Sequence, residues 1–285
     1  MHTHTCFCDG KDDTLTMCEA AYKKKLRAIG FSAHAPIEKK TGIKTDWHLR
    51  EDRLYEYIDQ VLAAKKKWRG KLEVFLGFEV DYIKGLRSPA DSDIKALNPD
   101  YLIGSAHYII PPNGARPFTV DGGAEEFEDG LREGFGGDAP SLMLHYYDMM
   151  AEMIAIGGFD ILGHADLIKK NCLTKNYWPP EYESIRQKEI AQAAAKAGLT
   201  VEVNTGGINR GKINEVYPSV SFLQFFRKCN VPAIITSDAH RAGDIDGNYD
   251  AAVRALLSSG FDEHVIYFEK TKNPLTKNKK VYKLE

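Results

Sequence analysis

Short apolar runs alternate with amphipathic helical segments along most of the chain, and this alternation constrains the fold more than any other feature. The apolar runs cover residues 28–33, 72–78, 101–105, 159–163, 199–203 and 231–236, and the helical periodicity covers 14–29, 53–69, 141–156, 183–197, 218–229 and 249–259. With a further strand at the amino terminus, the pattern predicts seven parallel strands connected by helices. Such βα units build an open doubly wound sheet or a closed barrel, so the fold class is α/β.

The segments between these elements favour a single domain over residues 1–285. Glycine and polar residues separate the elements, and no long linker rich in Pro, Gly and Ser divides them. Residues 108–140 interrupt the alternation with a hairpin-like turn at 111–114 and a glycine-rich acidic stretch, which predicts a lid or insertion. Residues 270–283 hold six lysines and are expected to form a solvated tail with at most one edge strand, rather than an arm that binds phosphate or nucleic acid.

The charge balance and the cysteine count limit the partners and the compartment. The chain has 38 basic and 40 acidic residues, a net charge of −2, which argues against binding to nucleic acid or a membrane surface and favours a small-molecule partner. No run approaches the ~18–20 apolar residues of a membrane span, and the amino terminus does not resemble a signal peptide. Five cysteines, an odd number, fit reduced thiols better than disulfides. We therefore expect a cytoplasmic protein, whose oligomeric state the sequence does not indicate.

Side chains that can bind metals stand at the ends of six of the seven predicted strands. In strand order they are His2 and His4, His34, Glu79 and Asp81, His107, His164 and Asp166, and Asp238 and His240. A single strand-end histidine is more often a hydrogen-bonded core residue. In barrels, however, the carboxyl ends of the strands converge on one pocket, and several buried polar groups at equal depth would be costly if unpaired. The joint pattern therefore favours a metal site.

The combination of imidazoles with carboxylates suits Zn²⁺, Mn²⁺ or Fe²⁺. Nine candidates are more than one ion needs, so two or three divalent ions are expected; they are His2, His4, Asp9, His34, Glu79, His107, His164, Asp238 and His240. Glu79 stands at the end of a central strand and is the natural bridge between ions. A thiolate zinc site at Cys6 and Cys8 is disfavoured, because no second pair of Cys or His ligands of the usual spacing accompanies them. Clustered divalent ions with open positions are typical of phosphoester hydrolysis.

Seven motifs, in chain order, resemble those of the polymerase and histidinol phosphatase (PHP) superfamily. They are His2-Thr3-His4-Thr5, residues 31–36, Gly77-Phe78-Glu79-Val80-Asp81-Tyr82, Gly104-Ser105-Ala106-His107, Gly163-His164-Ala165-Asp166, Asn204-Thr205-Gly206-Gly207 and Thr236-Ser237-Asp238-Ala239-His240. The motifs at 79–82 and 204–207 are most similar to the histidinol-phosphatase branch. The resemblance implies a distorted seven-stranded (β/α) barrel with a trinuclear metal centre.

Carried over by position, the resemblance also implies how the ligands are shared. One ion would be held by His2, His4, Glu79 and Asp238, a second by Glu79, His107 and His164, and a third by Asp9, His34 and His240. The strand that normally precedes the first histidine is reduced here to Met1. The acidic ligand of the third group usually stands one residue later, where this chain has Gly10, so Asp9 or alternatively Asp12 takes that place.

The function implied by the resemblance is hydrolysis of a phosphomonoester, with L-histidinol phosphate in histidine biosynthesis as the substrate. Lys170 and Arg210 occupy positions of basic residues that grip phosphate, although their ordinary role would be surface solubility. Together with Glu79 and Asp238 they are the expected catalytic residues. His48, in a loop, is a further candidate for substrate binding. Asp166 and His48 are the candidates for protonating the leaving alkoxide.

Two other functions stay open at this point. Another PHP phosphoesterase could act on nucleotides, sugar phosphates or phosphotyrosine, because substrate choice depends on loops. A non-catalytic metal-binding module, of the kind attached to some polymerases, is disfavoured because we expect no second domain for it to serve. A panel of phosphate monoesters, assayed with Mn²⁺, Zn²⁺ or Fe²⁺, separates these alternatives.

Overall fold

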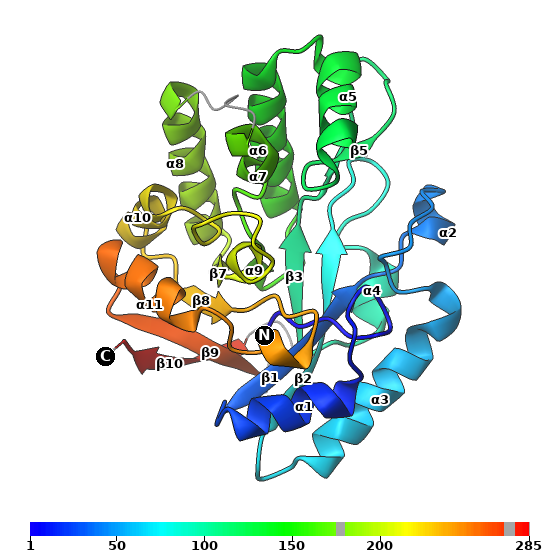
Figure 1. Cartoon of the computed structure of the whole chain (residues 1–285), viewed down its shortest axis with the longest axis vertical. Coiled ribbons are helices and arrows are strands. Elements are labelled where there is room, and N and C mark those ends of the chain that lie inside the picture. The colour runs from blue at the N-terminus through cyan, green and yellow to red at the C-terminus, as the bar shows by residue number, and fades with distance from the viewer. Residues whose placement is uncertain (175–179, 271–276, 285) are drawn as a thin grey trace.

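The computed structural model describes residues 1–174, 180–270 and 277–284 (Figure 1). Its main element is a curled sheet of eight strands, which in spatial order are β1 (Ala28–His34), β2 (Glu73–Asp81), β3 (Tyr101–Ser105), β6 (Ile161–Leu162), β7 (Thr200–Asn204), β8 (Ala233–Thr236), β9 (Glu263–Lys270) and β10 (Lys277–Lys283). Neighbours from β1 to β9 are parallel, and β10 is antiparallel to β9. The predicted α/β fold is confirmed.

The amino-terminal segment closes the curled sheet. Thr3 forms an isolated parallel bridge with Ala239, just beyond β8, and the amide of Ser32 in β1 donates to the carbonyl of Thr3 at 3.0 Å. The predicted first strand is therefore represented by a single bridge. With this segment, β1–β3 and β6–β8 make a distorted seven-membered barrel, as predicted, and β9 and β10 extend it at one edge.

The strands form where the sequence has continuous apolar runs. In a parallel sheet covered on both faces, residues that point in either direction are buried, and every residue of β3, β7 and β8 is buried here. The tail expected at 270–283 contains the one edge strand allowed for it, β10. Residues 263–270 form β9, an inner strand of the sheet that was not predicted.

Helices surround the barrel and cover its outer surface. They are α1 (Thr14–Lys23), α2 (Glu38–Thr41), α3 (Leu54–Lys67), α4 (Ser92–Ala96), α5 (Ala124–Phe135), α6 (Ala139–Ile156), α7 (Lys169–Thr174), α8 (Pro180–Lys196), α9 (Gly206–Asn209), α10 (Val220–Lys228) and α11 (Tyr249–Ser258), with the 3-10 turns η1 (Glu51–Arg53) and η2 (Ala242–Asp244). Helix α1 packs on α3 and β1, whereas α6 packs on α8 on another side of the barrel (Figure 1).

The predicted helix at 14–29 ends early, at Lys23. Lys25 adopts a positive φ of 58°, which a right-handed helix cannot continue through, and Ala28 already begins β1. The other five predicted helices are present with bounds within a few residues of those expected. Among the described residues, no helix is both long enough and apolar enough to cross a membrane.

The amino-terminal ends of the strands enclose a small apolar plug. Its buried members are Met1, Phe75, Tyr101, Ile103, Ile161, Ile234, Val265 and Phe268. The side chain of Tyr101 is accommodated by two glycines, because a Cβ at Gly30 would lie 2.6 Å from its hydroxyl and a Cβ at Gly77 would lie 2.5 Å from its ring. Polar side chains therefore converge at the other end of the barrel, where the strands finish.

The insertion at 108–140 is an ordered unit beside that end. Strands β4 (Tyr108–Ile109) and β5 (Phe118–Thr119) form the predicted hairpin, and its turn is closed by the amide of Gly114 donating to the carbonyl of Pro111 at 3.2 Å. Helix α5 follows. The amide of Val120, after β5, donates to the carbonyl of His107 at 2.8 Å, which ties the hairpin to the end of β3.

Candidate metal centre

The carboxyl ends of the strands bring the predicted ligands into four overlapping groups. Within each group the candidate ligand atoms lie within 4.8 Å of one another; the groups are His4, Asp9, His34 and His240; His2, His4 and Asp238; Glu79, His107 and His164; and His34, Asp81 and His107. All nine predicted ligands are members. The first three groups resemble those implied by the family resemblance, except that Glu79 is absent from the group of His2, His4 and Asp238, and that His4 also belongs to the group of Asp9.

Glu79 lies at the centre of the cluster. Its Oε2 is 3.1 Å from Nε2 of His2 and 3.0 Å from Nδ1 of His34, and its Oε1 is 3.0 Å from Nε2 of His164. The side chain is 1% exposed. Because the register of the parallel strands pairs Glu79 with His34, the two strand ends deliver both residues to the same depth. A carboxylate with one oxygen toward each of two histidine groups can bridge cations.

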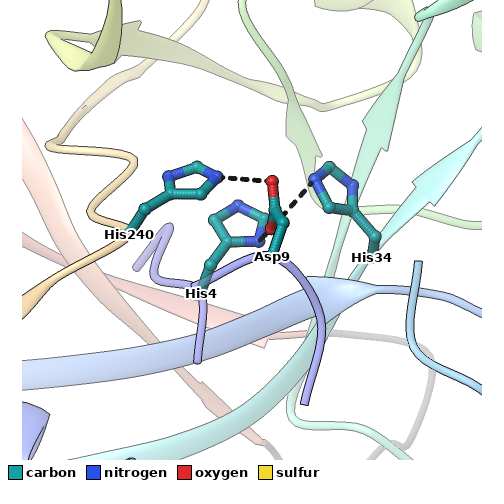
Figure 2. Close-up of side chains that lie close together, drawn as sticks. All are labelled: His4, Asp9, His34 and His240. Atoms are coloured by element: carbon teal, nitrogen blue, oxygen red, sulfur yellow. Dashed lines mark hydrogen bonds and ion pairs between the residues drawn. The ribbon is translucent and has the colours of Figure 1, made fainter. Parts of the chain in front are cut away.

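Figure 2 shows the group that contains Asp9, with His4, His34 and His240 around its carboxylate. Its Oδ2 is 2.9 Å from Nε2 of His240, and its Oδ1 is 3.5 Å from Nδ1 of His4 and 3.8 Å from Nε2 of His34. Asp12 instead accepts a hydrogen bond from a backbone amide in the loop after β8. Of the two alternatives, the structure thus brings Asp9 to the histidines.

Several ring nitrogens in the cluster are buried and make no well-oriented hydrogen bond with the described residues, although three of them face carboxylate oxygens at 3.0–3.2 Å. They are Nε2 of His2, Nε2 of His4, Nδ1 of His34 and Nδ1 of His164, together with Oε2 of Glu79. Buried polar atoms without a partner are rare in folded proteins, because each costs free energy. Imidazole and carboxylate atoms gathered in this way are the ligands that divalent transition metals prefer, so the residues fit metal ions.

The imidazoles and carboxylates of the cluster shift one another's pKa values so that the carboxylates stay ionised and His107 stays protonated. Burial alone would raise the pKa of Glu79, but the imidazoles of His2, His34 and His107 hold it well below its usual value. Burial alone would lower the pKa of His107, whereas the carboxylates of Asp81 and Glu79 raise it to about 10. Without metal, the buried carboxylates are therefore ionised and take their counter-charge from imidazolium protons, which a metal ion would replace.

Glu202 orients two of the candidate ligands and was not predicted to do so from the sequence. Glu202 in β7 is fully buried, and its Oε1 lies 2.5 Å from Nδ1 of His2 and accepts from the hydroxyl of Thr236 at 2.7 Å. Its Oε2 accepts from the backbone amide of His164 at 2.8 Å. Such a partner turns the opposite ring nitrogen of His2 toward the cluster. The signal was present, since Glu202 is the one charged residue in the apolar run 199–203.

Asp81 plays a similar part for His107. Its Oδ1 is 2.7 Å from Nδ1 of His107, and its Oδ2 is 2.8 Å from Nε2 of His48. His48 is thereby placed behind Asp81. The carboxylate of Asp166 contacts the amide of Ser219 at 2.8 Å and Nζ of Lys169 at 3.0 Å. Neither of the two candidates for leaving-group protonation, His48 or Asp166, is among the described residues that line the cavity above the cluster.

That cavity has a volume of about 300 Å³, enough for a small organic molecule. Its ligand-bearing floor and its walls are lined by Asp9, His34, Trp47, Glu79, His107, Thr119, Asp121, Gly122, His164, Leu167, Arg210, Asp238 and His240. The insertion contributes Thr119, Asp121 and Gly122, so it forms part of the wall.

The two predicted phosphate-gripping residues are placed differently. Arg210 lines the cavity, and its guanidinium donates to Oδ2 of Asp238 at 2.9 Å and to the carbonyl of the same residue at 3.2 Å. Lys170 instead donates through Nζ to the backbone carbonyl of Asp121. The structure therefore brings Arg210, and not Lys170, to the cavity wall.

The cysteines near the cluster are not part of these groups. Sγ of Cys8 lies 3.5 Å from Nδ1 of His4, but burial raises the pKa of the thiol to about 12, so it stays protonated. No cysteine belongs to any of the four groups formed by the described residues.

Known proteins have sequences and folds similar to those of this chain. The histidinol-phosphatase of Bacillus subtilis is 27% identical over 261 residues, which cover 88% of this chain and 96% of that protein. A Listeria monocytogenes protein, provisionally named a histidinol phosphatase, superposes with a TM-score of 0.76 at 24% identity and covers 87% of this chain and 97% of its own. A histidinol phosphate phosphatase from Lactococcus lactis, solved with zinc, L-histidinol and phosphate, has a TM-score of 0.63 at 18% identity, with 93% and 95% of the two chains covered.

The two structural likenesses support the barrel fold. The PHP domain family matches residues 1–206, which include five of the seven motifs completely, the first three residues of the motif at 204–207, and all the predicted ligands except Asp238 and His240. This match extends over well more than half of the chain. The chain therefore belongs to the PHP domain family.

Proposed function

We propose that this chain is a metal-dependent phosphomonoesterase that hydrolyses L-histidinol phosphate to L-histidinol and phosphate in histidine biosynthesis. The observation that carries the proposal is Glu79, shared between groups of histidines on the floor of a cavity that also presents Arg210. The substrate is supported by the relatives, one of which is named a histidinol-phosphatase and another of which binds L-histidinol and phosphate.

The cofactors in this proposal are two to three divalent ions, Zn²⁺, Mn²⁺ or Fe²⁺, held by the nine ligands. When bound, such ions supply an activated water nucleophile and stabilise charge on phosphoryl oxygens. Glu79 and Asp238 provide the negative charge that keeps cations close together. Glu202 and Asp81 fix the orientation of His2 and His107 through hydrogen bonds to their other ring nitrogens.

Arg210 is assigned to the phosphoryl oxygens. Its guanidinium lies on the wall beside Asp238, and a guanidinium can donate two parallel hydrogen bonds to a phosphate. Lys170 is assigned to positioning, because its ammonium holds the backbone of the insertion at Asp121. Residues 1–285 act as one domain, and the insertion at 108–140 covers the cavity as a lid.

A panel of phosphate monoesters tests the substrate. With metal supplied, kcat/KM for L-histidinol phosphate is expected to exceed that for nucleotides, sugar phosphates and phosphotyrosine by about tenfold or more, since a fitted polar contact is worth roughly 1.5 kcal/mol. Preference for another ester would reassign the substrate within the family. Absence of turnover with every ester, at full metal content, would instead indicate a non-catalytic module.

Arg210→Ala is expected to lower kcat/KM by about ten- to a hundredfold, because a charge-assisted hydrogen bond contributes roughly 1.5–3 kcal/mol. Inhibition by free phosphate should weaken in parallel, and Arg210→Lys should recover only part of the loss because an ammonium lacks the paired donors. Steady-state kinetics with metal analysis on the same samples measure both effects.

The matched control is Arg254→Ala, which removes an exposed arginine that pairs with Asp250 on α11. Loss of bound metal in Arg210→Ala would show that Arg210 serves to hold Asp238. Unchanged kinetics and unchanged phosphate inhibition would remove it from the site.

A further inference from the structure

The loop after β5 places a carboxylate residue in the wall of the cavity. Four acidic residues line it, and three of them, Asp9, Glu79 and Asp238, contact histidines of the cluster. The fourth is Asp121. Its carboxylate makes no hydrogen bond or ion pair with any residue that the structure describes, and it belongs to none of the metal-ligand groups.

The backbone around Asp121 is fixed from two sides. On one side the amide of Val120 donates to the carbonyl of His107 at 2.8 Å. On the other side Nδ2 of Asn171 donates to the carbonyl of Val120 at 2.8 Å, and Nζ of Lys170 donates to the carbonyl of Asp121. The loop is thus held by the end of β3 and by α7, although it belongs to the insertion. A group held in this way is preorganised for a ligand.

The charge of Asp121 is felt at the phosphate-binding side of the cavity. Burial lowers the pKa of Arg210, but the carboxylate of Asp238 and, to a smaller extent, that of Asp121 raise it, so that the net pKa is raised. The two side chains nevertheless form no ion pair within 4 Å in the described structure. Because Arg210 pairs with Asp238 instead, the carboxylate of Asp121 is available to a cation that enters the cavity.

An aromatic ring lines the same cavity. The indole of Trp47 stacks on Tyr108, the first residue of the insertion hairpin, with ring centroids 5.6 Å apart and an interplanar angle of 12°. Aromatic faces attract organic cations, and they also stack on planar heterocycles. The candidate metal ligands and Arg210 could therefore bind an anion in this cavity. Asp121 and Trp47, in its wall, could bind a cation.

We propose that Asp121, with Trp47, forms the subsite that selects a cationic organic group on the phosphate monoester. This inference rests on the proposed function, because L-histidinol phosphate carries an ammonium group and an imidazole beside its phosphate. Selection at Asp121 acts on the organic part of the substrate and leaves the phosphoryl group to the floor and to Arg210. It predicts that Asp121 discriminates between substrates without serving the chemical step.

The test compares Asp121→Asn with the wild type on two esters, L-histidinol phosphate and p-nitrophenyl phosphate, whose organic group carries no positive charge. Asparagine keeps the size of the side chain and removes its charge. We expect kcat/KM for L-histidinol phosphate to fall by about ten- to a hundredfold. The value for p-nitrophenyl phosphate should stay within about twofold of wild type, and metal content should be unchanged. Asp129→Asn, on the outer surface of the insertion, is the matched control.

A second measurement keeps the test independent of the assigned substrate. Phosphoethanolamine and ethyl phosphate differ by one ammonium group and can be compared as inhibitors of p-nitrophenyl phosphate turnover. Wild type should bind phosphoethanolamine more tightly, and Asp121→Asn should abolish that preference. If wild type ignores L-histidinol phosphate yet shows this preference, the proposed function fails and the subsite stands. An equal fall with both esters, or no change with either, would overturn the subsite.

Discussion

Glu79→Gln is expected to lose bound metal and to lower kcat/KM by more than about a hundredfold, since even residues that only orient metal ligands cost 10–100-fold when removed. The amide keeps the size of the side chain, and it can still accept the hydrogen bond that Ser105 donates to Oε1 at 2.6 Å. It cannot supply the negative charge that faces His2, His34 and His164. Elemental analysis and phosphatase kinetics on the same preparation measure both losses.

Glu73→Gln is the control from the same strand. Glu73 is the exposed first residue of β2, at the opposite end from the cluster, and the substitution makes the same chemical change. It should keep wild-type metal content and turnover. Metal content and turnover in Glu79→Gln that matched those of Glu73→Gln would mean that β2 does not end in the active site.

The convergence of the candidate ligands was predictable because it depends on local rules. Side chains two residues apart on an extended segment share a face, which places His2 with His4. Parallel strands finish at a common edge, so polar residues directly after apolar runs converge, however far apart they lie in the sequence. Glu79 and His34, 45 positions apart in the chain, meet in this way through strand register.

What the sequence did not predict depends on tertiary placement. The position of His48 in a loop is compatible with a substrate contact, but only the folded chain shows that Asp81 stands between it and His107. Lys170 likewise follows a strand end, yet its direction is set by the insertion, whose backbone it holds at Asp121. Strand β9 was missed because its apolar run, 265–268, is short and flanked by charged residues, and only Val265 and Phe268 of that run are buried.

Removing the metal is expected to abolish the activity almost completely, because the residues alone provide no strong nucleophile for the phosphorus atom. After treatment with a chelator, turnover should fall by more than about a thousandfold and return when Zn²⁺, Mn²⁺ or Fe²⁺ is added. The reconstituted protein should contain two to three ions per chain by elemental analysis. Its melting temperature should rise with metal concentration, since ligands that bind only the folded state stabilise it.

The affinity for metal should also rise with pH up to about 10, which would distinguish this buried cluster from ions bound at the surface. In the metal-free protein the carboxylates of Asp81 and Glu79 outweigh burial and raise the pKa of His107 to about 10, so its imidazole is protonated at neutral pH. An ion must displace that proton to reach the ring nitrogen. Metal binding should therefore release protons in lightly buffered solution, and the affinity should increase as the pH rises toward 10. A single ion or none in metal-supplemented, folded protein, or an affinity that is independent of pH, would contradict a buried cluster built on Glu79 and the strand-end histidines.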